Sequence, residues 1–304
     1  MQKLFTLFFC LFFEILSAQD IEISGFIKEN GSEKTIPFAT IEIFNRKLGV
    51  AANFQGKFLI KLSNSFENDT LTISSLGYEP KIIQVKWLFA NQSNATIFLQ
   101  PVIYQLKEVE IVGVPKGRYR LGNYEETKKG YGGFLTGQKS QIAVYMDSRK
   151  YGNAKIINAS FFIAKKSGIP ETPFRIRVYK VDKTSGNPGE DLIHENVIVH
   201  GKHHGGWMTT DLSKYNIKAP DDGYFIAMEW IHSGNQYFFK TYINIINKYL
   251  VAYGQVCSSS RAMQFSNTWT YVLGTGWHKD SEFIHDKGRI YLKAMITSEI
   301  EVLK

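Results

Sequence analysis

The chain has 304 residues, 44% of them hydrophobic, and a formal net charge of +8. This hydrophobic content supports packed cores and excludes an intrinsically disordered chain. The length suits two domains better than one. Tyr and Phe are abundant, and Val, Ile and Thr recur in alternating runs, which favours β-strands. No long stretch carries the paired caps of an α-helix, so the sequence predicts an all-β fold.

Residues 1–18 have the features of a secretory signal peptide. A short basic start is followed by the apolar run from Leu4 to Phe13, and Ala18 supplies a small residue before Gln19. The run is too short to span a bilayer, whose hydrocarbon core needs roughly 20 apolar residues. We therefore expect an exported protein, located in the periplasm, at the outer membrane or outside the cell, with no transmembrane segment in the mature chain.

The cysteines and the charge pattern narrow the possible partners. Removal of the signal peptide would take away Cys10 and leave Cys257 alone, which excludes an intramolecular disulfide. Cys257 is interpreted as a small buried residue, with a reactive thiol or an intermolecular bridge as the alternative. The basic residues are scattered, so no nucleic-acid partner is predicted. The positive net charge supports only a general attraction to anionic polysaccharide or lipopolysaccharide.

Short alternating strands with turn residues between them begin at Ile21, the pattern of a small all-β sandwich. A strand through Phe26 ends at the turn signal Asn30-Gly31, and a second strand runs from Phe38 to Phe44. In Asn53-Phe-Gln-Gly56, Asn can fold its side chain onto a neighbouring amide and Gly can take a positive φ. Further strands are predicted at Lys57 to Lys61, Thr70 to Ser75, Lys81 to Val85 and Ala95 to Leu99.

Three pieces in this order resemble the carboxypeptidase-regulatory-like domain, over about residues 22 to 100. They are Pro37-Phe-Ala-Thr, Asn53-Phe-Gln-Gly-Lys-Phe and Ser74-Ser-Leu-Gly-Tyr with an isoleucine-rich strand after it. The resemblance implies a transthyretin-like β-sandwich without catalytic residues, of a kind found in exported envelope proteins of Gram-negative bacteria. It also implies a short strand at Leu106 to Val112. We place this domain at residues 19–112.

Two activities suggested by that resemblance are not expected. A zinc carboxypeptidase needs a His-x-x-Glu pair, and no histidine of this sequence is followed by Glu at that spacing. The residues after the first domain are expected to be too few for the barrel of a TonB-dependent transporter. A Gly-x-Ser-x-Gly nucleophile motif is also missing from the sequence. No catalytic residue, metal ligand or cofactor is therefore assigned.

Residues 113–137 are rich in Gly, Lys and Tyr without sustained periodicity and are interpreted as a linker. Alternation returns afterwards and predicts a second, larger β-sandwich over residues 138–304. Its pieces Phe174-Arg-Ile-Arg-Val-Tyr, Pro188-Gly-Glu, Trp207 to Asp211 and Gly223-Tyr-Phe resemble, in this order, jelly-roll modules of extracellular bacterial proteins. The stretch Tyr224 to Ile231 is apolar on both faces and should be a central strand. Between the predicted strands lie turn clusters such as Ser185-Gly-Asn-Pro-Gly and Pro220-Asp-Asp-Gly.

The predicted second domain contains several candidate sites. His200, His203 and His204 could ligate a metal, but a solvated loop is the preferred interpretation, because two adjacent histidines rarely reach one ion. Asp221-Asp222 could bind calcium, although the Gly223 that follows suits a plain hairpin turn. Glu229 on an apolar strand is the most interesting carboxylate, and structural pairing with Arg175 or Arg177 is its expected role.

The aromatic residues of the C-terminal third give the one ligand-binding assignment. Trp269, Tyr271 and Trp277 lie in a Gly- and Thr-rich stretch, where exposed rings would offer flat apolar faces to a sugar. Burial in the core is the alternative for each of them. The leading hypothesis is an exported, non-catalytic binding or assembly module of the bacterial cell envelope, with polysaccharide or an envelope protein as partner. The alternatives are an unrecognised glycan-acting hydrolase and an accessory subunit of an outer-membrane transport complex.

Overall fold

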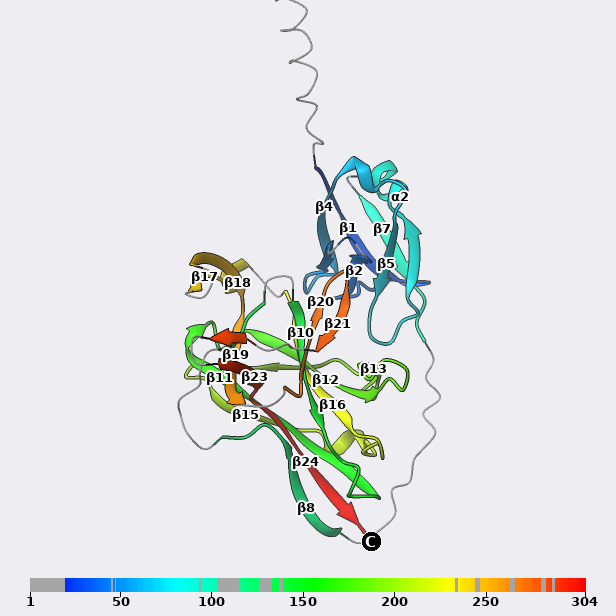
Figure 1. Ribbon diagram of the computed structural model, residues 1–304. Helices are drawn as coiled ribbons and strands as arrows, with labels where there is room; N and C mark the ends of the chain where they lie inside the picture. The colour runs from blue at the N-terminus through cyan, green and yellow to red at the C-terminus, as the bar shows by residue number, and fades with distance from the viewer. Residues whose placement is uncertain are drawn as a thin grey trace, which may run out of the picture. The chain divides into compact units, whose positions relative to one another are not determined.

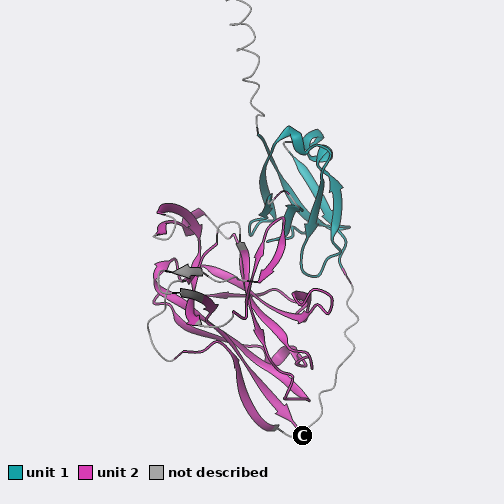
Figure 2. Ribbon diagram, in the orientation of Figure 1, with its two compact units in different colours: residues 1–44, 48–101 teal, residues 45–47, 102–304 magenta. Residues whose placement is uncertain are grey.

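The computed structural model describes residues 20–44, 46, 48–92, 94–102, 115–125, 133–136, 139–232, 235–243, 247–262, 266–279, 283–285 and 288–304. It is built almost entirely from β-strands, which confirms the all-β fold class (Figure 1). The predicted signal peptide at 1–18, Cys10 and the predicted strand at 106–112 lie outside the described residues. Two compact units divide the chain: residues 1–44 with 48–101, and residues 45–47 with 102–304 (Figure 2).

The first unit is a small sandwich of two sheets. One sheet has the order β4-β1-β7 and the other β3-β2-β5-β6. Strands β1 and β7 run parallel, and the other pairs are antiparallel. The elements are β1 (Ile21–Glu29), β2 (Thr40–Ile43), β3 (Leu48–Ala51), β4 (Lys57–Leu62), the 3-10 helix η1 (Asn64–Phe66), β5 (Thr70–Ser74), β6 (Lys81–Gln84), α2 (Val85–Ala90) and β7 (Ala95–Leu99).

Alternation along the strands places the core of this unit. In β4, Phe58, Ile60 and Leu62 are buried while the residues between them are exposed. Because successive side chains of a strand point to opposite faces, this pattern puts one face of the sheet on the core and the other in water. The core joins side chains of both sheets, including Ile23 of β1 and Ile41 of β2.

The turn before β4 forms as its residue types predict. The Asn53 Oδ1 atom accepts hydrogen bonds from the backbone N–H groups of Gln55 at 2.9 Å and Lys57 at 3.0 Å. Gly56 has a φ of 74°, a left-handed conformation that a residue without Cβ adopts at little cost. The side-chain bonds and the glycine together fix the start of β4.

The second unit contains two larger antiparallel sheets. The seven-stranded sheet has the order β13-β12-β16-β10-β20-β21, and β14 also pairs with β12. Its strands are β10 (Lys139–Met146), β12 (Pro173–Val181), β13 (Pro188–Asp191), β14 (Val197–His200), β16 (Tyr224–Trp230), β20 (Thr268–Val272) and β21 (Gly276–Lys279). Every residue of β16 is buried, and β16 lies between β12 and β10, so the prediction of a central strand is confirmed.

The eight-stranded sheet has the order β22-β23-β19-β11-β24-β8, with β15 also paired to β11 and β9 to β19. Its strands are β8 (Pro115–Gly122), β9 (Gly133–Phe134), β11 (Ala154–Gly168), β15 (Gly206–Asp211), β19 (Gln255–Ala262), β22 (Phe283–His285), β23 (Gly288–Ala294) and β24 (Ile296–Leu303). The connections also include the 3-10 helices η2 (Ser213–Tyr215) and η3 (Asn235–Tyr237). Strands β8 and β24 run side by side at the lower end of Figure 1.

One hydrophobic core joins the two sheets of this unit. Ile142, Ile176 and Ile226 contribute from the seven-stranded sheet, and Phe161 and Ile300 from the eight-stranded sheet. A buried polar bridge crosses the same layer. The Tyr224 hydroxyl donates to Ser298 Oγ at 2.9 Å, and Ser298 Oγ donates to the Asn158 carbonyl at 2.7 Å. Each polar atom therefore keeps a partner in the interior, as burial requires.

The interpretation of residues 113–137 as a linker is wrong where the structure describes this segment. Strand β8 pairs with β24, from Gly122 opposite Thr297 to Gly117 opposite Val302, and β9 pairs with β19. Strand β8 is the last strand of its sheet in the described order. An edge strand can carry charged and exposed side chains, so the apolar alternation that identifies a half-buried strand is missing from its sequence.

The remaining pair, β17 (Phe238–Ile243) and β18 (Lys248–Tyr253), forms a two-stranded sheet of its own. Its register places Phe238 opposite Tyr253 and Tyr242 opposite Tyr249. This hairpin lies at the upper left of Figure 1.

Candidate functional site

A polar groove crosses the outer face of the eight-stranded sheet, over strands β8, β24, β11 and β15. It consists of two adjoining hollows of about 460 Å³ and 270 Å³, which share Asn158 and Thr209 in their walls. We call this site the polar groove. Its lining residues are Arg118, Arg120, Tyr124, Lys155, Ile157, Asn158, Ser160, Trp207, Thr209, Asp211, Ser213, Thr297, Glu299 and Glu301. Hollows of this combined size lie within the range of small-molecule sites.

Strand register brings the charged groups of the groove together. Arg118 lies opposite Glu301 and Arg120 opposite Glu299, because β8 and β24 are antiparallel. The Nε atom of Arg118 is 3.1 Å from Glu301 Oε1, and Nη2 of Arg120 is 3.8 Å from Glu299 Oε1. Lys155 of β11 adds a second cation at 3.6 Å from Glu301 Oε2. Residues two apart on a strand share a face, so all four side chains of the two strands point into the groove.

Hydrogen bonds hold the middle of the groove in place. The Nδ2 group of Asn158 donates to Glu299 Oε2 at 2.8 Å, and Asn158 Oδ1 accepts from the Glu299 backbone N–H at 3.1 Å. Ser160 Oγ and Thr209 Oγ1 are 2.8 Å apart. These bonds orient the amide, hydroxyl and carboxylate groups before any ligand arrives.

Aromatic rings form one end of the groove. Tyr124 and Trp207 are stacked, with ring centroids 5.3 Å apart and planes inclined by 25°. Phe162 packs its edge against Trp207 at 5.4 Å, and the Arg120 guanidinium lies 4.5 Å from the centre of the Tyr124 ring. Tyr124 remains 45% exposed. The groove thus combines an aromatic wall with fixed donors and acceptors.

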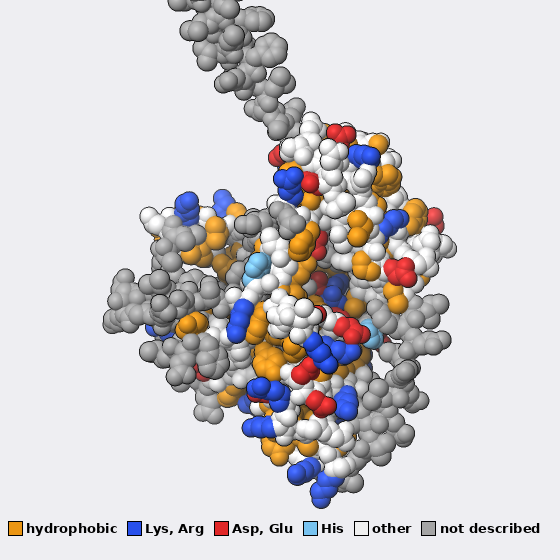
Figure 3. Space-filling model, turned by 45° about the vertical axis from the view of Figure 1, so that its right-hand side comes forward, with side chains coloured by type: hydrophobic (Ala, Val, Ile, Leu, Met, Phe, Trp, Pro, Cys, Tyr) orange, Lys and Arg blue, Asp and Glu red, His pale blue; other side chains and the backbone are white. Residues whose placement is uncertain are grey.

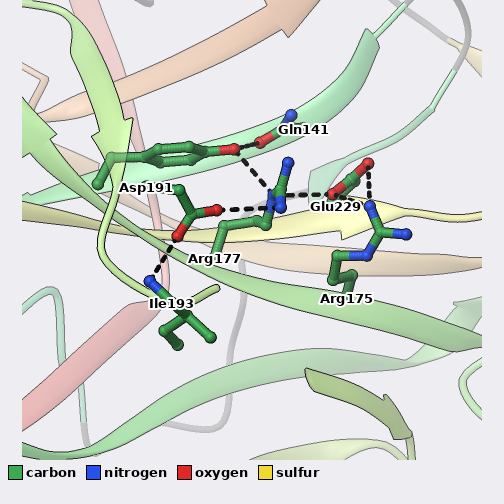
Figure 4. A network of polar contacts seen from close by, with 7 residues as sticks. Gln141, Arg175, Arg177, Asp191, Ile193 and Glu229 are labelled. Carbon is green, nitrogen blue, oxygen red and sulfur yellow. Dashed lines mark hydrogen bonds and ion pairs between the residues drawn. The ribbon is translucent and has the colours of Figure 1, made fainter. Parts of the chain in front are cut away.

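A second polar cluster lies buried on the other sheet, where Figure 4 shows two arginines around Glu229. Glu229 Oε2 is 3.1 Å from Arg175 Nη1 and 3.1 Å from Arg177 Nε. Arg177 Nη1 is also 3.0 Å from Asp191 Oδ2. The prediction that Glu229 pairs with Arg175 or Arg177 is confirmed, and it pairs with both. We call these four residues with Tyr179 and Gln141 the arginine cluster.

Burial sets the proton affinities in the arginine cluster. It raises the pKa of Asp191 to about 6, against the opposing effect of Arg177. Burial also lowers the pKa of Arg175, and Glu229 acts in the opposite direction. The Tyr179 hydroxyl donates to Gln141 Oε1 at 2.7 Å, and burial raises the pKa of Tyr179. Each acid has an arginine beside it, the arrangement of a structural network.

The three aromatic residues assigned to ligand binding lie together on the β20–β21 hairpin. Tyr271 and Trp277 are cross-strand partners with ring centroids 5.3 Å apart. Trp269 is only 8% exposed, packs edge-on against Phe225 at 4.9 Å and donates from Nε1 to Asn187 Oδ1 at 3.1 Å. For Trp269 the core alternative holds. Tyr271 and Trp277 are half-buried, and their ligand role stays a prediction.

The other candidate residues take ordinary structural positions. His203 is 80% exposed and its Nδ1 atom lies 3.7 Å from Glu171 Oε1. Gly223 has a φ of 91° and its backbone N–H donates to the Pro220 carbonyl at 3.2 Å, so residues 220–223 form a turn before β16. The Tyr145 hydroxyl donates to the Asp222 carbonyl at 2.8 Å. Among the described residues, no three His, Cys, Asp or Glu side chains lie close enough to hold a metal ion. Cys257 is buried, and burial raises the pKa of its thiol to about 12.

Sequence reasoning missed the polar groove, although a signal for it was present. Arg118 and Arg120 alternate in one segment, and Glu299 and Glu301 alternate in another. Opposite charges at the same spacing are typical of facing positions on paired strands. The segment of Arg118 lacks the apolar alternation of a half-buried strand, so the sequence pattern does not place it opposite Glu299 and Glu301.

Comparison with known proteins identifies the first unit. Residues 23–111 match the family described as the CarboxypepD_reg-like domain. The N-terminal unit is a CarboxypepD_reg-like domain. The predicted resemblance is therefore confirmed. A CarboxypepD_reg-like domain is a non-catalytic β-sandwich module, and it is typical of secreted proteins.

Other comparisons add little to this. No curated protein matches the chain. The infectious bursal disease virus VP2 subviral particle is similar at 10% identity and a TM-score of 0.26, covering 88% of this chain and 61% of that chain. T=1 particles derived from the same virus give 9% identity and a TM-score of 0.21, covering 88% and 59%. The chain thus spans about three fifths of those proteins, and likeness at this level carries no argument.

Over the described ranges, none of the helices has the length and apolar character needed to cross a membrane.

Proposed function

We propose that this protein is an exported, non-catalytic binding module of the bacterial cell envelope whose polar groove binds polysaccharide. The observation that carries the proposal is the combination of the stacked Tyr124–Trp207 wall with the fixed polar groups of Asn158, Thr209 and Glu299. A sugar ring has apolar C–H faces and a rim of hydroxyl groups. An aromatic wall beside oriented donors and acceptors suits both parts.

The open shape of the groove favours a polymer over a small free molecule. The two hollows adjoin along the strands, and Arg118 and Lys155 lie at the end opposite the aromatic wall. A chain of sugar units can lie along such a groove with its ends in solvent. Carboxylates and cations both line the groove, so the hydroxyl groups of a neutral or mixed-charge glycan would find both donors and acceptors.

Export is the second part of the proposal. It is supported by the basic and apolar residues before Gln19 and by the CarboxypepD_reg-like domain, a type common in secreted proteins. We infer the periplasm, the outer-membrane surface or the exterior as the location.

The Tyr271–Trp277 pair is retained as a second candidate surface, without the buried Trp269. Its half-buried rings lie on the other sheet of the same unit and could contact a glycan or an envelope protein. An accessory role in an outer-membrane transport complex would use a surface of this kind.

The hydrolase alternative is less well supported by the geometry. A glycosidase needs two carboxyl groups that flank the scissile bond, one of them carrying a proton. Glu299 and Glu301 lie two apart on one strand, and each faces a cation of β8. This arrangement favours a role in binding over a role in acid catalysis.

The test is binding of the mature protein to a glycan array, followed by calorimetry with the best polysaccharide. Tyr124→Ala and Trp207→Ala should each weaken binding by about tenfold, because each removes part of the stacking wall. Trp277→Ala reports on the second surface: if it alone abolishes binding, the groove is the wrong site.

Trp87→Ala serves as the matched control, since Trp87 lies in the other unit and is 39% exposed. It should leave affinity unchanged. Melting temperatures of all variants separate lost binding from lost folding. Release of reducing sugar that disappears in Glu299→Gln would instead favour the hydrolase.

A further inference from the structure

The β17–β18 hairpin exposes apolar side chains along most of its length. We call residues 238–243 and 247–253 the arm. Tyr249 is 74% exposed, Val251 59%, Phe238 47%, Tyr242 44% and Leu250 40%. Figure 3 shows hydrophobic side chains gathered with basic ones at its upper left, where the arm lies. Large apolar side chains concentrated in one short element mark an interaction surface.

The root of the arm is anchored, so its exposure is not a sign of an unfolded segment. Tyr253 is buried and packs against Phe238 and His232, with ring centroids 5.0 Å away in both cases. The Tyr253 backbone N–H donates to Thr136 Oγ1 at 2.6 Å. An isolated two-stranded hairpin is marginally stable in water, and this anchoring holds the base while the far end extends.

Most exposed apolar groups of the arm share one face, and Leu250 is exposed on the other. The register places Tyr242 opposite Tyr249 and Lys240 opposite Val251, so these four share one face. Leu250 lies between Tyr249 and Val251 in sequence and therefore points to the other face. A flat protein partner would cover one face and leave the other in water. A fluid lipid layer can contact both faces of the arm.

The charges of the arm are all positive. Lys240 and Lys248 lie within it, and the sequence from Trp230 to Lys279 contains no Asp or Glu. A partner with negative charge would complement this stretch. Tyrosine adds a further indication, because its ring is apolar and its hydroxyl is polar, a combination suited to the boundary between lipid and water.

We propose that the arm binds an anionic lipid surface by shallow insertion between the headgroups. The depth follows from the backbone: the outer edges of a two-stranded sheet have unpaired N–H and C=O groups, which hydrocarbon cannot satisfy. Headgroups and water can satisfy them, while the apolar side chains reach the upper acyl region. Two copies of the arm pairing with each other is disfavoured, because the lysines of both copies would be brought together.

The experiment is co-sedimentation of the mature protein with phosphatidylcholine vesicles, with or without phosphatidylglycerol. We expect binding only when phosphatidylglycerol is present, weakened about fivefold for each of Lys240→Gln and Lys248→Gln. Tyr249→Ser with Val251→Ser should lower binding by about tenfold or more. Ile82→Ser is the matched control, because Ile82 is 68% exposed in the other unit, and it should bind as the wild type does.

A second readout does not depend on a loss of binding. Val251→Cys can be labelled selectively with an environment-sensitive fluorophore, because Cys257 is buried. Its emission should shift to the blue when phosphatidylglycerol vesicles are added. Unshifted emission, or sedimentation that none of the arm variants changes, would overturn the proposal. Sedimentation velocity without lipid tests self-association: a dimer lost in the Tyr249→Ser, Val251→Ser variant would assign the arm to a second copy instead.

Discussion

Asp191 and Arg177 show how charged side chains of the arginine cluster are paired where they are buried. Arg177 reaches both Glu229 and Asp191, with its Nε and Nη1 atoms about equally distant from the two carboxylates. The side chain of Arg177 is 14% exposed and that of Asp191 is 11% exposed. A buried charge without a partner is strongly destabilising, whereas an ion pair with a buried carboxylate offsets part of the desolvation cost. The cluster therefore specifies the positions of β12, β13 and β16 more than it adds stability.

Replacing Asp191 with Asn should change how stability depends on pH. Burial raises the folded-state pKa of Asp191 to about 6, above its usual value of 3.8. Because the folded state binds the proton more tightly, the contribution of Asp191 to stability is fully present below about pH 3.8 and is lost as the pH rises through about 6. Urea unfolding at several pH values should show this fall in the wild type and a smaller one in Asp191→Asn. Parallel profiles of the two proteins would contradict the assignment.

Strand β1 is the element on which the first unit depends. It pairs with β4 on one side and with β7 on the other, and its Ile23 and Ile27 are fully buried. Gly25 stands between them at the point where the neighbouring backbone comes closest. A Cβ atom at this position would lie 1.9 Å from the Ala95 carbonyl oxygen and 2.8 Å from Phe58 Cε1. No side chain can be accommodated there without moving β7.

Gly25→Ala should accordingly destabilise the first unit by about 1–3 kcal/mol, the usual cost of overpacking a well-filled site. Ser24→Ala, the neighbouring position on the same strand, is the control and should stay within about 0.5 kcal/mol. Hydrogen exchange measured by mass spectrometry will locate the effect. Protection from exchange should fall in peptides from residues 20–101 and should stay unchanged in peptides from β10 to β12. Equal loss in both units would mean that the substitution acts elsewhere.

At the scale of the molecule, each of the two units contains a core of its own. The core of the first unit draws on residues from Ile23 to Leu99, and the main core of the second on residues from Phe134 to Val302. The groove and the arm both belong to the second unit, and the CarboxypepD_reg-like match covers the first. Binding is thus proposed for the second unit.

Two fragments, residues 20–101 and 102–304, should therefore fold separately. Each should give the circular dichroism of β-structure and a cooperative thermal transition, because each retains its own buried apolar core. The larger fragment should keep the polysaccharide affinity of the whole chain. An unfolded 20–101 fragment would show that its core needs residues from the rest of the protein.

The amino-acid sequence alone determined the parts of this protein that depend on local pattern. Alternation predicted the described strands of the first unit except β3, Asn53 and Gly56 predicted its turn, and three short motifs identified the domain. The stretch around Ile226 is apolar on both faces, and this pattern predicted a central strand. In each case neighbours along the chain contain the necessary information, since side-chain direction alternates with sequence position.

Only the tertiary structure decided where distant residues meet. Arg118 and Glu301 are 183 positions apart and form an ion pair because β8 and β24 close one edge of a sheet. Trp207 and Trp269 have the same chemistry, yet the first lines a groove and the second is core. Composition cannot separate these outcomes, because the exposure of a ring depends on which strands cover it. The candidate site is therefore a property of strand pairing, which the local pattern of an edge strand does not reveal.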